Sequence, residues 1–98
     1  MEIIKTKNSN ELTLRLIGLL TTESSPQLEK AIKEDLDGIT SLVFDLSELN
    51  YTTSAGLRVF LASHKFMTPK GKMTIKNIND DIKEIFEMTG MINIFNIE

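Results

Sequence analysis

The segment YTTSAGL, residues 51–57, joins a short apolar strand to an apolar helix in this 98-residue chain. The strand is Leu42–Leu46, and the helix is expected to begin at about Ser54. The first backbone N–H groups of a helix have no partner within the helix, and this end of the helix attracts negative charge. A phosphate added to the Ser54 hydroxyl would therefore meet a backbone that already favours an anion.

Two roles are open for Ser54. Serine is among the commonest N-cap residues and contributes about 1 kcal/mol to a helix, so a plain cap is the simpler interpretation of any single serine. Ser54 could also be a switch residue, and the two roles are compatible. A capping serine presents its hydroxyl at the N-terminus of the helix, where a modification would act. A catalytic nucleophile is not favoured, because the chain shows no accompanying catalytic set.

Charge and composition exclude several classes of function. The formal net charge is −3, and 11 Lys and Arg residues are scattered among 14 Asp and Glu residues, so neither nucleic acid nor an anionic membrane is an expected partner. The chain has no cysteine, and His64 is its single histidine, so metal sites and acid–base dyads lack converging partners. No P-loop or dinucleotide-binding motif is present. We expect no cofactor, no metal and no enzymatic activity.

A single domain over residues 1–98 is expected, because no linker, repeat or low-complexity tract divides the chain. No apolar run is long enough to span a bilayer, so we expect no insertion into the membrane. Residues 1–6 read as a strand and not as a signal peptide. We therefore expect the protein in the cytoplasm.

Two strands at the N-terminus are expected to form an antiparallel hairpin. They cover Met1–Lys7 and Glu11–Ile17, and the connector at residues 8–10 is short and rich in turn formers. Apolar and polar residues alternate along the second strand, which indicates one buried face. A loop is expected over Gly18–Glu23. The residues expected on the buried face of the second strand are Leu12, Leu14 and Leu16.

The first helix is expected from about Ser24 to Leu36, and two starts are open. Ser24 with Gln27 fits a capping box. Ser25 with Pro26 fits an N-cap followed by proline at the first helical position. The residues expected on its buried face are Leu28, Ala31, Ile32 and Leu36.

The rest of the chain alternates strands and helices. The run at residues 42–44 is apolar without a break, which indicates a central strand buried on both faces. The order β-β-α-β-α-β-α-β predicts an α/β fold with a mixed four- to five-stranded sheet, an N-terminal antiparallel hairpin and covering helices. The remaining expected elements are a strand at Ser41–Leu46, a helix at Ser54–Met67, a strand at Lys72–Asn77, a helix capped by Asn79 and ended by Gly90, and a strand at Ile92–Ile97.

Three motifs, in this order, resemble the STAS domain, the family of anti-sigma factor antagonists and of the cytoplasmic domains of sulfate transporters. Residues 16–20 (LIGLL) resemble the family's Gly-x-Leu segment. Residues 44–46 (FDL) and 53–57 (TSAGL) resemble its strand and its Asp-Ser-Ser-Gly-Leu signature. Residues 86–91 (FEMTGM) resemble its closing helix end and turn. The resemblance covers nearly the whole chain and implies the STAS fold.

The resemblance also implies a mechanism. In the bacterial antagonists of this family, the first serine after the signature aspartate is phosphorylated, and Ser54 stands at that position. The unphosphorylated antagonist binds an anti-sigma factor, often a serine kinase with a GHKL-type ATP site. Phosphorylation breaks that complex, and a PP2C-type phosphatase restores the unphosphorylated form. The family therefore implies partner switching at Ser54.

The chain departs from the family pattern at two positions. Thr53 stands where the signature has its aspartate, and Thr21 stands where an acidic residue usually follows Gly-x-Leu. Less negative charge beside Ser54 eases the accommodation of a phosphate. The same departures remove contacts that a kinase or its metal would use. An alternative stays open: a constitutive STAS adaptor subunit of a lipid-transport ABC system or of a sensory scaffold, without phospho-switching.

The second helix is apolar on two faces. One stripe, expected to be buried, consists of Leu57, Phe60, Leu61 and His64. A helix on the outside of a small sheet cannot be covered on every side, so the other stripe is a candidate docking surface. Scattered exposed apolar residues are normal, which is the plainer interpretation. This second stripe consists of Val59, Ala62 and Phe66.

Four threonines on two loops are expected at one edge of the sheet, near Ser54, although threonine also simply suits strand ends and turns. Gly56 has two open interpretations, a weak helix former or a point of close backbone approach. The complete set of residues expected to bind the partner is Thr21, Thr22, Thr52, Thr53, Ala55, Gly56, Arg58, Val59, Ala62 and Phe66.

Overall fold

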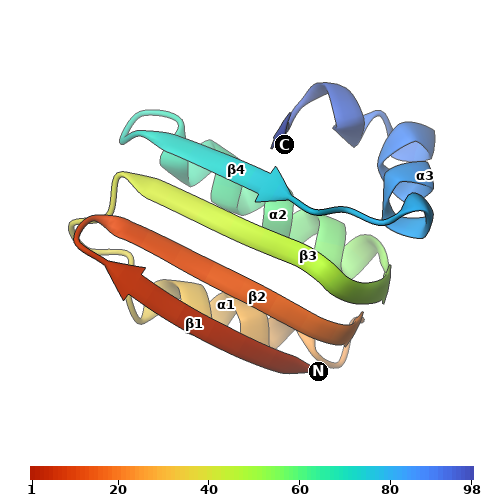
Figure 1. Ribbon diagram of the computed structural model, residues 1–98, viewed down its shortest axis with the longest axis horizontal. Helices are drawn as coiled ribbons and strands as arrows, with labels where there is room; N and C mark the ends of the chain where they lie inside the picture. The colour runs from red at the N-terminus through yellow and green to blue at the C-terminus, as the bar shows by residue number, and fades with distance from the viewer.

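The computed structural model describes residues 1–98 and contains one five-stranded sheet with three α-helices (Figure 1). The order of elements confirms the predicted α/β fold with its N-terminal hairpin. The elements are β1 (Glu2–Asn8), β2 (Glu11–Leu20), α1 (Ser25–Lys33), β3 (Ser41–Thr52), α2 (Ser54–Met67), β4 (Lys72–Lys76), α3 (Asp80–Thr89), a 3₁₀ turn η1 (Met91–Asn93) and β5 (Asn96–Ile97).

The strands lie in sequence order, β1-β2-β3-β4-β5. β1 pairs with β2 antiparallel, whereas the other three pairings are parallel. Successive right-handed crossovers between parallel strands place their helices on the same side of the sheet. Accordingly, α1 and α2 lie behind the sheet in Figure 1, and α3 follows β4 beyond the end of that strand. No helix of the structure is long and apolar enough to cross a membrane.

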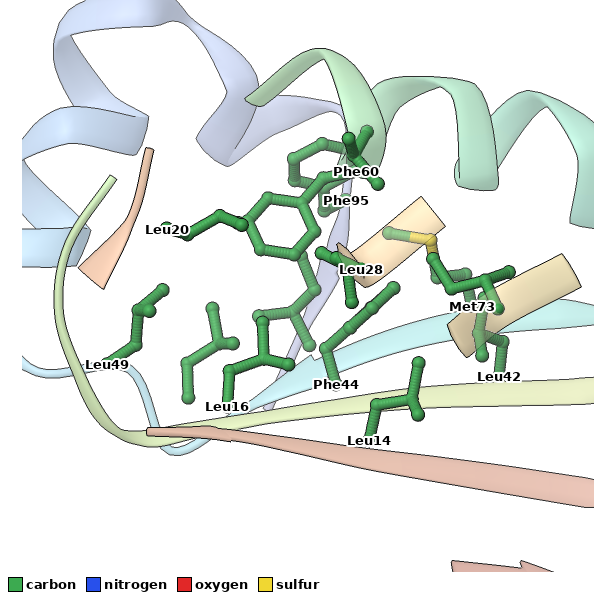
Figure 2. Close-up of a cluster of buried hydrophobic side chains, with 14 of the residues drawn as sticks. Leu14, Leu16, Leu20, Leu28, Leu42, Phe44, Leu49, Phe60, Met73 and Phe95 are labelled. Atoms are coloured by element: carbon green, nitrogen blue, oxygen red, sulfur yellow. The ribbon is translucent and has the colours of Figure 1, made fainter. Parts of the chain in front are cut away.

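Alternation along the strands builds the core between the sheet and the helices. Leu12, Leu14 and Leu16 are fully buried, as the period of two predicted. Figure 2 shows side chains of the sheet rising toward Phe60 of α2 and toward Phe95. The Phe60 ring meets the Phe44 ring edge-on, with centroids 5.0 Å apart, which is a favourable aromatic geometry. The core is therefore a one-sided layer, and the other face of the sheet is not covered by a helix.

The predicted loop at Gly18–Glu23 is wrong in its first half, because residues 18–20 continue β2. They pair with the end of β3, which runs to Thr52 and not to Leu46. Gly18 has a φ of +106°, and register shifts flank it, so the ladder resumes after an irregularity that a glycine permits. Strict alternation breaks at this point, and for that reason the sequence pattern indicated a loop.

The start of α1 matches neither predicted cap in full. Ser24 occupies the N-cap position, but its side chain makes no cap hydrogen bond. The Ser24 hydroxyl accepts from the Thr21 N–H at 2.8 Å and donates to the Leu19 carbonyl at 3.0 Å. The Gln27 amide donates to the Met1 carbonyl and does not close a capping box. Tertiary partners therefore replace the local cap, and the helix ends at Lys33, before the predicted Leu36.

The prediction of a last strand over Ile92–Ile97 is mostly wrong. Gly90 ends α3 as predicted, with a φ of +78°, and a 3₁₀ turn follows it. The turn brings Phe95 into the core, where it is 6% exposed, so only Asn96–Ile97 remains to pair with β4. Burial of one aromatic ring thus takes precedence over a longer edge strand. The predicted cap of α3 is confirmed, because the Asn79 side chain accepts from the Ile82 N–H.

Asp45 faces the uncovered side of the sheet, where we predict a pH-dependent contribution to stability. Its Oδ1 accepts from the Ser47 N–H at 3.1 Å and from the Asn77 amide at 3.2 Å. Burial alone would raise the pKa of this carboxyl, but these bonds and the Lys76 charge lower the pKa overall. A folded-state pKa below the unfolded value means that the contribution is present above the unfolded pKa and is lost as the pH falls through the folded pKa.

The substitution Asp45→Asn should therefore lower the free energy of unfolding by about 1 kcal/mol at pH 7. The difference between the two proteins should shrink as the pH falls below the ordinary aspartate pKa of 3.8. Urea denaturation of both proteins from pH 7 to pH 3 measures this. A difference that stayed constant over the whole range would contradict an electrostatic role.

Candidate functional site

Ser54 lies on the surface as the first residue of α2, one position inside the helix. The N-cap position belongs to Thr53, whose backbone is extended with φ −103° and ψ 177°. The interpretation of Ser54 as a plain N-cap is therefore wrong. The exposed Ser54 hydroxyl makes no cap hydrogen bond at the helix end.

The first turn of α2 is uncapped and carries no acidic residue. The first N–H of the helix with a backbone partner is that of Leu57, which donates to the Thr53 carbonyl at 3.1 Å. The N–H groups of Ser54, Ala55 and Gly56 have no backbone or side-chain acceptor. Partial positive charge therefore gathers around the Ser54 hydroxyl.

Gly56 seats this end of α2 on the sheet. A Cβ atom at Gly56 would lie 2.6 Å from Cγ of Leu20 and would overlap the Thr52 hydroxyl. The interpretation of Gly56 as a point of close backbone approach is therefore correct. The segment that comes close to its backbone is the end of β2, at Leu20. The Thr53 N–H also donates to the Leu20 carbonyl at 3.0 Å. These two contacts hold the N-terminus of α2 against the paired ends of β2 and β3.

The four threonines do gather at this edge, because Thr52 is the register partner of Leu20 and the two loops follow directly. Their exposure differs. Thr22 is exposed and Thr21 is half-buried. Thr52 is only 2% exposed, and its hydroxyl donates to the Thr53 carbonyl at 3.2 Å, so its side chain is buried within the domain and not available at the surface. The Thr53 hydroxyl is buried without a hydrogen-bond partner.

A groove of about 370 Å³ runs between α1 and α2. Val59, predicted to be exposed, is only 5% exposed and lies in the floor of the groove, because α1 covers this side of α2. Ala62 and Phe66 are exposed along its side. The Lys70 ammonium stands 4.4 Å from the centre of the Phe66 ring. Of the three residues predicted to form a docking stripe on α2, only Ala62 and Phe66 are therefore accessible to a partner.

Sequence reasoning missed an apolar pair at the same edge. Leu19 and Tyr51 are register partners in β2 and β3, and each is 51% exposed. Their strand neighbours Leu20 and Thr52 point into the core. No local pattern could identify this pair, because the register shifts around Gly18 decide which side chains turn outward.

The surroundings of Ser54 do not activate it as a nucleophile. The side chain bonded to its oxygen is Arg58, a donor with no capacity to accept a proton. His64 is half-buried further along α2 and packs edge-on against Phe95, with ring centroids 5.8 Å apart. No group of three or more His, Asp or Glu residues is placed to hold a metal ion. The geometry presents an exposed hydroxyl at the start of α2, with no neighbouring side chain that could take its proton.

Two curated proteins resemble the chain over nearly its full length. BtrV of Bordetella bronchiseptica, whose name places it among the anti-sigma factor antagonists, is 30% identical over 97 residues, which cover 97% of this chain and 84% of BtrV. The anti-sigma-B factor antagonist of Listeria monocytogenes is 26% identical over 98 residues, covering 97% of this chain and 85% of that protein.

Solved structures agree on the fold. The Bacillus anti-sigma factor antagonist SpoIIAA matches with a TM-score of 0.77 in both its unphosphorylated and its phosphorylated form, at 14% and 15% identity. The matches cover 99% of this chain and 87% and 91% of the two SpoIIAA chains. The family model for the STAS domain matches residues 2–98. With a match over almost every residue, the chain belongs to the STAS domain family.

Proposed function

We propose that this protein is a non-enzymatic anti-sigma factor antagonist of the cytoplasm that switches partners at Ser54. The observation that carries the proposal is the exposed Ser54 hydroxyl at the uncapped start of α2. Two relatives bear the name of anti-sigma factor antagonist, and SpoIIAA of the same fold is known in both phosphorylation states. These likenesses support the proposal.

The physical basis of the switch is the charge of a phosphate on a docking surface. Phosphorylation adds a charge of about −1.5 to −2 to a serine at neutral pH. The Leu19 and Tyr51 side chains offer exposed apolar area at the strand ends that precede α2, and a partner that covers them together with Ser54 must also dehydrate whatever Ser54 carries. An unmodified hydroxyl is dehydrated at far smaller cost than a dianion. Phosphorylation of Ser54 therefore opposes docking.

The proposed partner surface differs from the set expected on sequence alone. Thr52, Gly56 and Val59 are buried and act by positioning the surface residues. Leu19 and Tyr51 join the surface because both are exposed at the same edge. The surface thus comprises Leu19, Thr21, Thr22, Tyr51, Thr53, Ser54, Ala55, Arg58, Ala62 and Phe66.

The proposed partners follow from the same scheme. The anti-sigma factor is a serine kinase of the GHKL type, which binds the unphosphorylated surface and supplies the ATP site that this chain lacks. A PP2C-type phosphatase removes the phosphate and restores binding. Thr53 and Thr21 leave the surroundings of Ser54 without the acidic residues usual in the family, so the phosphate meets no like charge from these two positions.

The substitution Ser54→Asp tests the switch. An aspartate introduces negative charge at the helix mouth, so the variant should lose a kinase-like anti-sigma factor that wild type retains. Affinity capture from the native cytoplasm, with partners identified by mass spectrometry, measures this. Ser54→Ala is the matched control and should retain the partner, because it adds no charge. Equal partner sets for all three proteins would instead favour a constitutive adaptor with no phospho-switch.

The substitution Tyr51→Ala tests the apolar part of the surface. Tyrosine is enriched among interface hot spots, where truncation costs about 2 kcal/mol or more, so affinity for the captured anti-sigma factor should fall at least tenfold. Calorimetric titration of the purified pair measures this. Met88→Ala is the control, because Met88 is 78% exposed on α3 and lies outside the proposed surface. An unchanged affinity for Tyr51→Ala would exclude this edge from the interface.

A further inference from the structure

Arg58 is a cation without a carboxylate partner. Every ion pair of the structure is made by Lys5 or Arg15, with Glu34, Asp35 or Glu48. The Arg58 side chain is exposed, and its Nη2 donates to Oγ of Ser54 across 3.4 Å. The guanidinium is thus aimed at the oxygen to which a phosphate would be attached.

The helix itself fixes this arrangement. Residues four apart on a helix are neighbours on the same face, so Arg58 lies one turn above Ser54. Long helical side chains lean toward the N-terminus of their helix, which brings the guanidinium down onto the first turn. The contact is therefore built into α2 and does not depend on a loop.

We propose that Arg58 holds the phosphate of phosphorylated Ser54. The inference rests on the proposed function, since it concerns the modified state of Ser54. A guanidinium presents a planar fork of N–H donors that matches phosphate oxygens, and the bonds are charge-assisted. The weak bond to the hydroxyl becomes an ion pair within the protein. Arg58 also lines the α1–α2 groove, so its capture by the phosphate removes a cation from the rim that a partner meets.

Phosphoserine introduced at position 54 during translation, by an expanded genetic code, tests this assignment on the intact chain. The variants are wild type, Arg58→Gln and Lys65→Gln, each with serine and with phosphoserine. Lys65 is the matched control, because it is an exposed cation of the same helix in its last turn. The readouts are the thermal midpoint and the NMR signal of the Arg58 Nε–H group.

The phosphorylated Arg58→Gln protein should melt about 2–4 °C below phosphorylated wild type, the range expected when a surface ion pair is lost from a small domain. The two unphosphorylated proteins should melt together. In wild type, phosphorylation should shift the Nε–H signal and slow its exchange with water. The same loss in Lys65→Gln, or an Nε–H signal that phosphorylation leaves unchanged, would overturn the assignment.

The outcome is separable from that of the switch itself. Because phosphoserine is supplied during synthesis, Arg58 can hold the phosphate whether or not any kinase modifies Ser54 in the cell. A failed partner switch with an intact Arg58 effect would reject the proposed function alone. A working switch without the Arg58 effect would reject this inference alone.

Discussion

The rest of the site depends on one contact. The N-terminus of α2 packs against the paired ends of β2 and β3. Gly56 offers no side chain to the interface, so Leu20 and Thr52 fill the space that a Cβ atom would need. The Thr53 N–H is bonded to the Leu20 carbonyl, which ties the helix start to the strand end. Once this contact is made, Ser54 is the first residue of the helix and turns outward, with free N–H groups around it.

The helices cover only one face of the sheet, and the exposed apolar side chains of the proposed site lie at the ends of β2 and β3. The aromatic rings of Phe44, Phe60 and Phe95 occupy the space between the helices and the covered face. The uncovered face carries paired or hydrogen-bonded charges, such as Arg15 with Glu48 and Asp45 with Asn77. Accessible apolar side chains occur at the strand ends that precede the exposed Ser54, where Leu19 and Tyr51 lie. Exposed apolar patches often mark interaction sites, which supports the proposed partner surface at this edge.

Much of the fold could be predicted, because its signals are local. The bounds of α2 at Ser54 and Met67, the Asn79 cap and the Gly90 end of α3 follow from cap and breaker residues, and the structure agrees with each. The inward residues of β2 follow from a period of two. The extension of β2 and β3 could not be predicted, since it depends on pairing across a register shift near Gly18. The burial of Thr52 and Val59 could not be predicted either, because Thr52 pairs with Leu20 of β2 and Val59 lies beside residues of α1, and both segments are distant in the sequence.

The sequence by itself determined the order of elements, the family resemblance and the serine at the start of an apolar helix, because propensities, caps and periodicity act over a few residues. Only the tertiary structure decided which side chains of that region meet solvent. It buried Thr52 and Val59, exposed Leu19 and Tyr51, and moved the N-cap from Ser54 to Thr53. Exposure is set by what packs against a residue, and the elements that pack here are up to about thirty residues apart in the chain, as Leu20 and Thr52 are. The sequence determines which chemical groups the site contains, and the packing determines which of them are accessible at the surface.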